Sequence, residues 1–183
     1  IVAAEKLLAG DVAGMPSFIV NLIRQQVAEP ALEKEMQGSV ETLAGTPGPA
    51  VDDQAELPAP AWNNVAARQE MSLAEIMRSQ IPGVDVPRFA EGPVNTLVVG
   101  CRTGEAAINL ALQHPQSRIT GIDQSTANVA YAWRQAMQRG INNARFMVGG
   151  LEDLASHDQK YHLIGAPDAL SRTANGLQAL QAL

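Results

Sequence analysis

The chain has 183 residues, of which 46% are hydrophobic, so it can form one globular domain and a smaller segment but not two full domains. Thirteen Lys and Arg against 19 Asp and Glu give a net charge of −6, which disfavours nucleic acid as a partner. The single cysteine, Cys101, excludes an internal disulfide, and one Cys with three scattered His predicts no metal site.

Neither a membrane span nor a leader is expected from the residues given. No run of about 18 apolar residues is present, and no charged start precedes a short apolar stretch. With its lone cysteine, the chain is expected in the cytoplasm. It begins at Ile1 rather than Met and stops at Leu183 within an apolar helical pattern, so we expect both ends to be cuts in a longer polypeptide.

Residues 1–44 are predicted to form an N-terminal helical segment. From residue 15 onward, apolar residues recur at helical spacing. Pro30 is expected to separate two amphipathic helices, the second of which continues through Val40 and Leu43.

A linker and a lead-in are expected next. Residues 45–60 contain four prolines and several acidic residues, a composition typical of a linker. In the lead-in, residues 61–93, a helix is predicted from Trp62 to Gln80. Ser72 and Glu75 within it match a capping box.

Residues 94–183 alternate between short apolar runs and helical patterns, which predicts an α/β domain with a parallel sheet. We expect four strands in the order 3-2-1-4. The predicted strands cover residues 96–99, 118–122, 145–148 and 162–164, and the predicted helices cover residues 105–113 and 125–139.

The second of these helices has a predicted buried face. Val129, Trp133, Ala136 and Met137 share one side of it, and Gly140 is its stop signal. Its aromatic residues are expected to pack on the sheet rather than stack on nucleic-acid bases, because they are not interleaved with Lys or Arg.

A glycine loop, Gly100–Gly104, follows the first strand directly and precedes a helix. At such a junction the backbone turns sharply, and the free amides of the helix face a ligand. The second strand ends on Asp123, 23 residues after Gly100, close to the roughly 20 expected for an acid that binds ribose. NAD is a less favoured nucleotide, because no third glycine completes the dinucleotide pattern.

The stretch "LVVGCRTGEAAINLALQHPQSRITGIDQSTANVAYAWRQAMQRGINNARFMVGGLEDL" resembles the class I S-adenosylmethionine-dependent methyltransferases. More narrowly, it is similar to the bacterial methyltransferase domains that are often joined to tetratricopeptide repeats. The matching stretches are Gly100–Gly104, His114–Ser125 and Ala130–Asn142. The resemblance implies a Rossmann-like class I methyltransferase sheet, incomplete at its C-terminus, with S-adenosylmethionine as the cofactor.

The resemblance also implies roles for individual residues in binding this cofactor. Gly100, Thr103 and Gly104 would lie under the methionine moiety, Asp123 would hold the ribose, and Leu151 would cover the adenine.

The sequence departs from the family pattern at three positions. Arg102 replaces the middle glycine of the loop, so its side chain either leaves the cleft or pairs with the cofactor's carboxylate. Gly150 stands where the family has an acid that bonds the adenine, and Asp153 lies three residues further on. His162 stands where the family usually has an aspartate. Beyond it, Pro167 and Asp168 are expected at the rim of the site.

The expected function is therefore methyl transfer from S-adenosylmethionine to a small molecule or a protein side chain. No catalytic residue is identifiable. The alternative is a catalytically inactive methyltransferase-like domain that serves as an interaction or assembly subunit. Retention of Gly100, Gly104 and Asp123 favours the enzyme, whereas the three departures favour the inactive domain.

Three of these residues also have a purely structural interpretation. Asp123 could cap the helix that begins near Ser125. Cys101, at the end of a buried strand, is typical of a small core residue. His114 lies at a helix end, where a cation is favoured by the dipole.

The fourth strand would be an open edge in a sheet with this order. Leu177, Leu180 and Leu183 would add an apolar face beside it. We expect this edge to be covered by a missing C-terminal segment, by the N-terminal helices or by a partner subunit.

Overall fold

The computed structural model describes residues 14–44, 46, 57–65 and 69–166. The chain divides into two compact units, residues 1–39 and 40–183. The expected rim residues Pro167 and Asp168 and the apolar helix predicted near Leu177 lie outside the described residues.

A single helical run makes up the described part of the first unit. It consists of α2 (Ser17–Ile23), η1 (Arg24–Ala28) and α3 (Glu29–Gln37). The prediction that Pro30 separates two helices is wrong. Pro30 lies in the first turn of α3, where a missing N–H is tolerated, and the preceding η1 is a π-helix whose wider turn accommodates the ring.

A short strand follows this run. The prediction that the second helix continues through Val40 and Leu43 is wrong, because Glu41–Thr42 form β1. Thr42 lies opposite Val148, and the Leu43 N–H donates to the Val148 carbonyl at 2.9 Å. Leu43 is 1% exposed, so its burial against a strand far along the chain overrides the local helical pattern.

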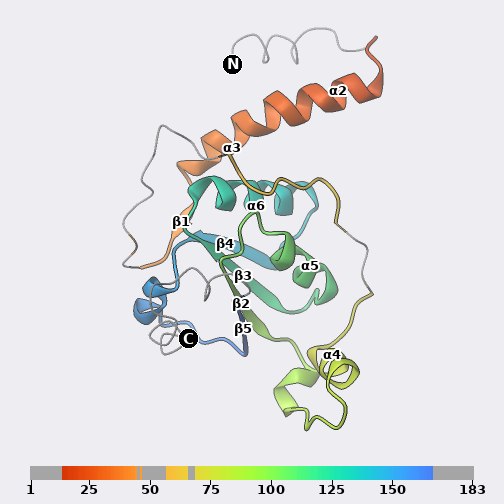
Figure 1. The fold of residues 1–183 in the computed structure, drawn as a ribbon, viewed down its shortest axis with the longest axis vertical. Coiled ribbons are helices and arrows are strands. Elements are labelled where there is room, and N and C mark those ends of the chain that lie inside the picture. The colour runs from red at the N-terminus through yellow and green to blue at the C-terminus, as the bar shows by residue number, and fades with distance from the viewer. Residues whose placement is uncertain (1–13, 45, 47–56, 66–68, 167–183) are drawn as a thin grey trace. The chain divides into compact units, whose positions relative to one another are not determined.

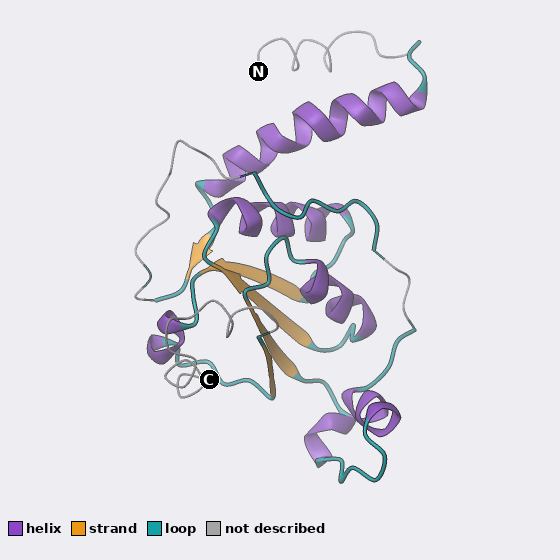
Figure 2. Cartoon of the chain, in the orientation of Figure 1, coloured by secondary structure: helices purple, strands orange, loops and turns teal. Residues whose placement is uncertain are grey.

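The second unit contains a five-stranded parallel sheet, in which strands alternate with helices (Figures 1 and 2). The strand order is β1-β4-β3-β2-β5. This confirms the predicted order of four strands and adds β1 beside β4. The strands are β1 (Glu41–Thr42), β2 (Asn95–Val99), β3 (Arg118–Asp123), β4 (Ala144–Val148) and β5 (Leu163–Gly165), and the α-helices of this unit are α4 (Leu73–Gln80), α5 (Glu105–Gln113) and α6 (Thr126–Gln138).

Each face of the sheet has its own apolar cluster, because side chains alternate along a strand. On one face, Val98, Ile119 and Phe146 pack with residues of α5 and α6. On the other, Leu97, Ile122 and other strand residues pack with the segment that contains the short 3-10 helix η3 (Glu152–Ser156). The sheet is therefore buried on both faces, as expected for parallel strands.

The buried face of α6 differs from the predicted one. Val129 and Ala136 are buried as expected, but Met137 is 62% exposed, so its placement on this face was wrong. Arg134 and Gln135 are each 2% exposed instead. Both bury a polar end because each has a partner in the fold: the Arg134 guanidinium donates to Gln138, and the Gln135 amide donates to the carbonyl of Trp62.

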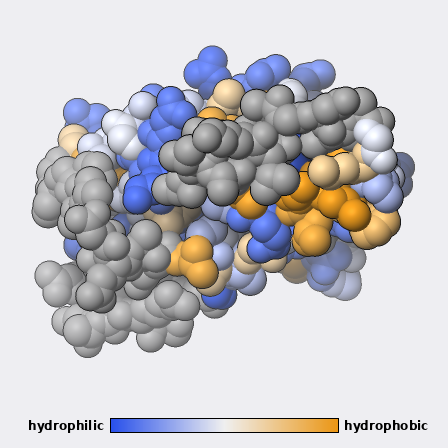
Figure 3. Space-filling view, turned by 90° about the horizontal axis from the view of Figure 1, so that it is seen from above, coloured by the Kyte–Doolittle hydropathy of each residue, from blue (hydrophilic) through white to orange (hydrophobic). Residues whose placement is uncertain are grey.

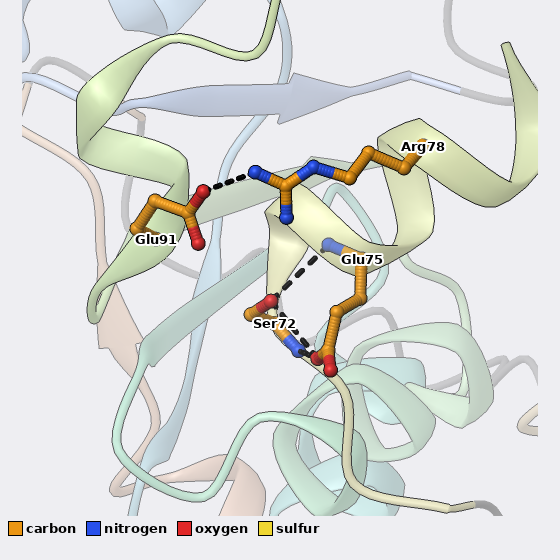
Figure 4. A network of polar contacts seen from close by, with 4 residues as sticks. All are labelled: Ser72, Glu75, Arg78 and Glu91. Atoms are coloured by element: carbon orange, nitrogen blue, oxygen red, sulfur yellow. Dashed lines mark hydrogen bonds and ion pairs between the residues drawn. The ribbon is translucent and has the colours of Figure 1, made fainter. Parts of the chain in front are cut away.

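The helix predicted from Trp62 onward begins only at Leu73. The predicted capping box at its start is confirmed: the Ser72 hydroxyl accepts from the Glu75 N–H at 3.1 Å, and the Glu75 carboxylate accepts from the Ser72 N–H (Figure 4). Further along α4, Arg78 forms an ion pair with Glu91 of the 3-10 helix η2 (Arg88–Glu91), and this exposed pair joins the two elements (Figure 4).

Apolar side chains also gather at the surface between hydrophilic ones (Figure 3). On α2, Phe18 is 68% exposed and Leu22 is 56% exposed. None of the helices in the described ranges is both long and apolar enough to cross a bilayer.

Candidate functional site

The loop after β2 and the acid that ends β3 lie side by side. Val99 is paired with Ile122, so the carboxyl ends of the two parallel strands lie at the same end of the sheet. The Cys101 N–H continues the pairing by donating to the Ile122 carbonyl at 2.9 Å. The candidate site is therefore at the carboxyl ends of β2 and β3, where ligands of open α/β sheets bind.

The loop turns by means of three residues with positive φ. Gly100, Arg102 and Gly104 have φ values of 66°, 53° and 81°. A side chain at this backbone conformation is uncommon, so Arg102 adopts a shape that a glycine adopts without strain. A Cβ on Gly104 would lie 2.5 Å from the Cβ of Ala132, which explains why only glycine fits where the loop packs against α6.

Asp123 fixes this loop to the start of α6. Its Oδ2 accepts from the Arg102 N–H at 2.8 Å. Its Oδ1 accepts from the Ser125 N–H at 3.0 Å and from the Asn128 side-chain amide at 3.1 Å. Asp123 is 9% exposed. The alternative that it caps α6 is wrong, because the N-cap is Ser125, whose hydroxyl accepts from the Asn128 N–H at 3.3 Å.

These bonds limit what Asp123 offers a ligand. A carboxylate has about four acceptor positions, and the described residues fill three of them. Oδ1 accepts two of these hydrogen bonds and Oδ2 accepts one, so one acceptor position on Oδ2 remains. Asp123 can therefore accept one hydroxyl bond without losing a protein partner.

Thr103 binds a segment whose residues Trp62 and Pro60 lie 41 and 43 positions earlier in the chain. It is 1% exposed, and its hydroxyl donates to the Pro60 carbonyl at 2.7 Å. In return, the Trp62 indole N–H donates to the Thr103 carbonyl at 3.0 Å. We name residues 59–63 the strap, because two hydrogen bonds join them to the glycine loop.

The strap is anchored on α6. The Trp62 N–H donates to the Tyr131 hydroxyl at 2.8 Å, and the Gln135 amide donates to the Trp62 carbonyl at 2.9 Å. The Arg139 guanidinium lies 4.9 Å from the centroid of the Trp62 ring and donates to the Asn63 carbonyl at 2.7 Å. The helix predicted at Trp62 was therefore wrong, because these side chains satisfy its backbone groups in place of helical partners.

A third segment follows the carboxyl end of β4 and lies at the same end of the sheet. The Gly150 N–H donates to the Asp153 carboxylate at 2.8 Å. The Asp153 side chain therefore points back to position 150, where the family has an acid. A Cβ on Gly150 would lie 2.6 Å from a Glu152 carboxylate oxygen, which accepts from Gln124 at 2.7 Å. Leu151 is 4% exposed and packs in the second apolar cluster.

Burial shifts the pKa of Cys101, in the glycine loop, and of His114, at the opposite end of α5 from the site. Burial, followed by the negative charge of Asp123, raises the pKa of Cys101 well above its usual range, so the thiol stays neutral in the core. At the end of α5, burial lowers the pKa of His114, against a smaller opposing effect of a hydrogen bond with the backbone of Met71. Burial therefore disfavours the cation that was expected at this helix end.

His162 lies away from the carboxyl ends of the strands. It precedes β5, and its Nδ1 accepts from the Asn95 N–H at 3.0 Å at the start of β2. It therefore lies at the amino end of the sheet. Across the described residues, no three Cys, His, Asp or Glu side chains gather into a group that could hold a metal ion.

Three solved structures illustrate what the fold is similar to. The YcgJ protein of Bacillus subtilis is 23% identical over 49% of this chain and 38% of its own, with a TM-score of 0.44. The plantazolicin methyltransferase BpumL, solved with SAH, is 26% identical over 52% of this chain and 35% of its own, with a TM-score of 0.44. PKMT2 of Rickettsia typhi, solved with AdoHcy, is 24% identical over 46% of this chain and 17% of its own, with a TM-score of 0.43.

The present chain thus spans well under half the length of each of these proteins. A protein-family model described as a methyltransferase domain matches residues 92–183, which is half of the chain. These residues contain the glycine loop, Asp123 and the four strands β2 to β5. The chain therefore belongs to the methyltransferase domain family, with the Rossmann-like sheet of the class I enzymes.

Proposed function

We propose that this chain forms the cofactor-binding part of an S-adenosylmethionine-dependent methyltransferase. The observation that carries the proposal is the bond between Asp123 and the backbone of Arg102, which joins the acid after β3 and the turn after β2 into one unit. The hydrogen-bonded acid and turn lie beside the N-terminus of α5, whose amides favour a negatively charged ligand group. When bound, S-adenosylmethionine supplies an activated methyl group, and the protein's task is mainly positioning.

The loop fits such a cofactor because its backbone can be approached closely. Gly100 adds no side chain, whereas the missing side chain of Gly104 makes room for α6. We propose that both glycines lie under the methionine moiety together with the backbone of Thr103. The Thr103 hydroxyl is already bonded to Pro60, so this residue would contact the cofactor through its main chain. Asp123 would hold the ribose through its remaining acceptor position.

The adenine end would lie near the segment after β4. Leu151 is packed in the core, so we propose that it contributes a fixed surface beside Gly150 rather than a moving side chain. Gly150 itself carries no acid. Glu152 supplies a carboxylate within 2.6 Å of the position that a Cβ at 150 would occupy, and we propose that it takes the place of the missing acid.

Arg102 is the third element of the proposal. Its positive φ keeps the loop in the shape that glycine would adopt. We propose that its guanidinium pairs with the cofactor's carboxylate, which would turn the departure at this position into a contact. The methyl acceptor is a small molecule or a protein side chain, and no residue is assigned as a general base.

Titration calorimetry on the 183-residue chain tests the proposal. S-adenosylmethionine and S-adenosylhomocysteine should both bind, whereas NAD at the same concentration should not. A ligand present at 100 times its dissociation constant should also stabilise the fold by about 2.7 kcal/mol in thermal unfolding. Absence of heat and of any thermal shift with both ligands would contradict it.

A catalytically inactive methyltransferase-like domain is the second candidate function. The observation that favours it is that protein donors fill three acceptor positions of Asp123, which lowers the gain from a ribose hydroxyl. The two candidates differ in the calorimetric result: the inactive assembly subunit predicts no binding at millimolar ligand.

The edge of the sheet at β5 supports a proposal about partners. Among the described residues, β5 pairs with β2 alone, and Leu163 on it is 38% exposed. We propose that this edge is covered in the native assembly by further chain or by a partner subunit. Hydrogen exchange should then be slower for residues 163–165 in the native assembly than in the 183-residue chain. Equal rates would contradict the proposal.

A further inference from the structure

The peptide unit between Thr103 and Gly104 is held on both sides. Its carbonyl accepts from the Trp62 indole N–H at 3.0 Å. Its N–H, on Gly104, donates to the Cys101 carbonyl at 2.9 Å within the loop. Because a peptide unit is planar, fixing both groups fixes the orientation of the turn that leads into α5.

The strap and the loop are joined through Asp123 as well. The Ala59 N–H donates to the Asn128 side-chain oxygen at 3.1 Å, and the amide of the same side chain donates to Asp123 at 3.1 Å. Asp123 accepts from Arg102, and the Thr103 hydroxyl returns to the strap at Pro60. These hydrogen bonds therefore connect the strap to both Asp123 and the glycine loop, the two parts of the proposed cofactor site.

Trp62 is the centre of this arrangement. It is 9% exposed, its ring meets Tyr131 edge to face at 6.0 Å, and its backbone is held by Tyr131 and Gln135. Since the ring is buried in the first apolar cluster, it cannot serve as an exposed surface for a ligand. Any effect of its indole N–H on a ligand must pass through the Thr103 carbonyl.

We propose that Trp62 is a positioning residue for the cofactor: its indole N–H holds the glycine loop in the binding geometry before the cofactor arrives. This inference rests on the proposed cofactor site. A loop that is ordered in advance loses less conformational entropy on binding, so removal of the indole bond weakens binding without removing a direct contact. By linkage, a bound cofactor must in turn tighten the contact between the strap and the loop.

The test compares S-adenosylhomocysteine binding to the 183-residue chain and three variants. Trp62→Phe keeps an aromatic ring and removes the indole N–H. Thr103→Val keeps the shape of the side chain and removes the hydroxyl bond to the strap. Trp133→Phe is the matched control, because it changes the other tryptophan of the chain, which is partly buried on α6.

We expect Trp62→Phe and Thr103→Val each to weaken binding by about five- to tenfold, as for loss of one hydrogen bond, and Trp133→Phe to leave the affinity unchanged. Binding is measured at a temperature at which circular dichroism shows each variant folded. Thr103→Val keeps the test decisive if Trp62→Phe does not fold. A purely structural role predicts lower unfolding temperatures in both variants with unchanged affinity, and that result overturns the inference.

The indole N–H of Trp62 offers a second readout by nuclear magnetic resonance. Trp133→Phe leaves Trp62 as the only tryptophan, so its indole signal is assigned directly. Addition of S-adenosylhomocysteine should slow its hydrogen exchange, and an unchanged rate in the bound state overturns the inference. If the unaltered chain binds no S-adenosylhomocysteine, both the proposed function and this inference fail; if it binds and the two strap variants bind equally well, only this inference fails.

Discussion

The carboxylate of Asp123 accepts the backbone N–H of Arg102 at 2.8 Å, so the acid that ends β3 holds the turn that follows β2. A residue expected to bind a ligand is therefore also part of the frame of its own site. Its removal should affect both binding and folding, and the experiments must separate the two effects.

Asp123→Ala should weaken S-adenosylhomocysteine binding by about tenfold or more, because it removes a charge-assisted acceptor. It should also lower the free energy of unfolding by about 1 to 3 kcal/mol, since the partly buried N–H groups of Arg102 and Ser125 lose their partner. Asp123→Asn is the control, because it keeps one oxygen acceptor and removes the charge. Calorimetry and urea unfolding give the two quantities, and unchanged affinity in the alanine variant would exclude Asp123 as a ligand.

Arg102→Gly tests the departure in the loop. If the side chain hinders the cofactor, glycine should tighten binding, because it suits the φ of 53° and permits close backbone approach. If the guanidinium pairs with the cofactor's carboxylate, as we propose, binding should weaken. Arg102→Ala is the matched control, because it removes the guanidinium and keeps the backbone strain. Calorimetry decides: equal weakening in both variants supports the contact, whereas tighter binding by the glycine variant contradicts it.

The central elements of this fold were predictable because their signals are local. The bounds predicted for β2, α5, β3, α6 and β4 agree with the structure to within one residue or so, since each has a periodic pattern and a glycine or a cap at its end. Asp123 was found from its spacing to Gly100, although its role as a partner of Arg102 was not.

The missed features depend on contacts between distant parts of the chain. Trp62 is separated from Thr103 by 41 positions and from Tyr131 by 69, so nothing near it in the sequence distinguishes a strap from a helix. Leu43 binds the backbone of Val148, and two residues of β1 are too few to show a periodicity of their own. In both places tertiary partners override the local preference.

Acid should destabilise the fold through His114. Burial holds its pKa below the ordinary value of 6.5, so the unfolded chain binds this proton more readily than the folded one. The stabilisation from neutral His114 is therefore complete above about pH 6.5 and is lost as the pH falls through 6.5 toward the folded pKa. Urea unfolding from pH 8 to pH 5 should show a larger loss for the unaltered chain than for His114→Asn, which cannot titrate. Parallel curves would contradict the assignment.

Gly104→Ala should be strongly destabilising, because two costs coincide at this position. The φ of 81° disfavours any side chain by about 1 to 2 kcal/mol, and the new Cβ would lie 2.5 Å from the Cβ of Ala132 on α6, where overpacking costs about 1 to 3 kcal/mol more. Gly140→Ala is the matched control: its φ is 67°, but nothing lies within 4 Å of the added Cβ, so only the first cost applies. Urea unfolding should place the Gly104 variant at least about 1 kcal/mol below the Gly140 variant. Equal losses in the two variants would mean that α6 moves to make room for the new Cβ. The packing of the loop on α6 would then not explain why position 104 is a glycine.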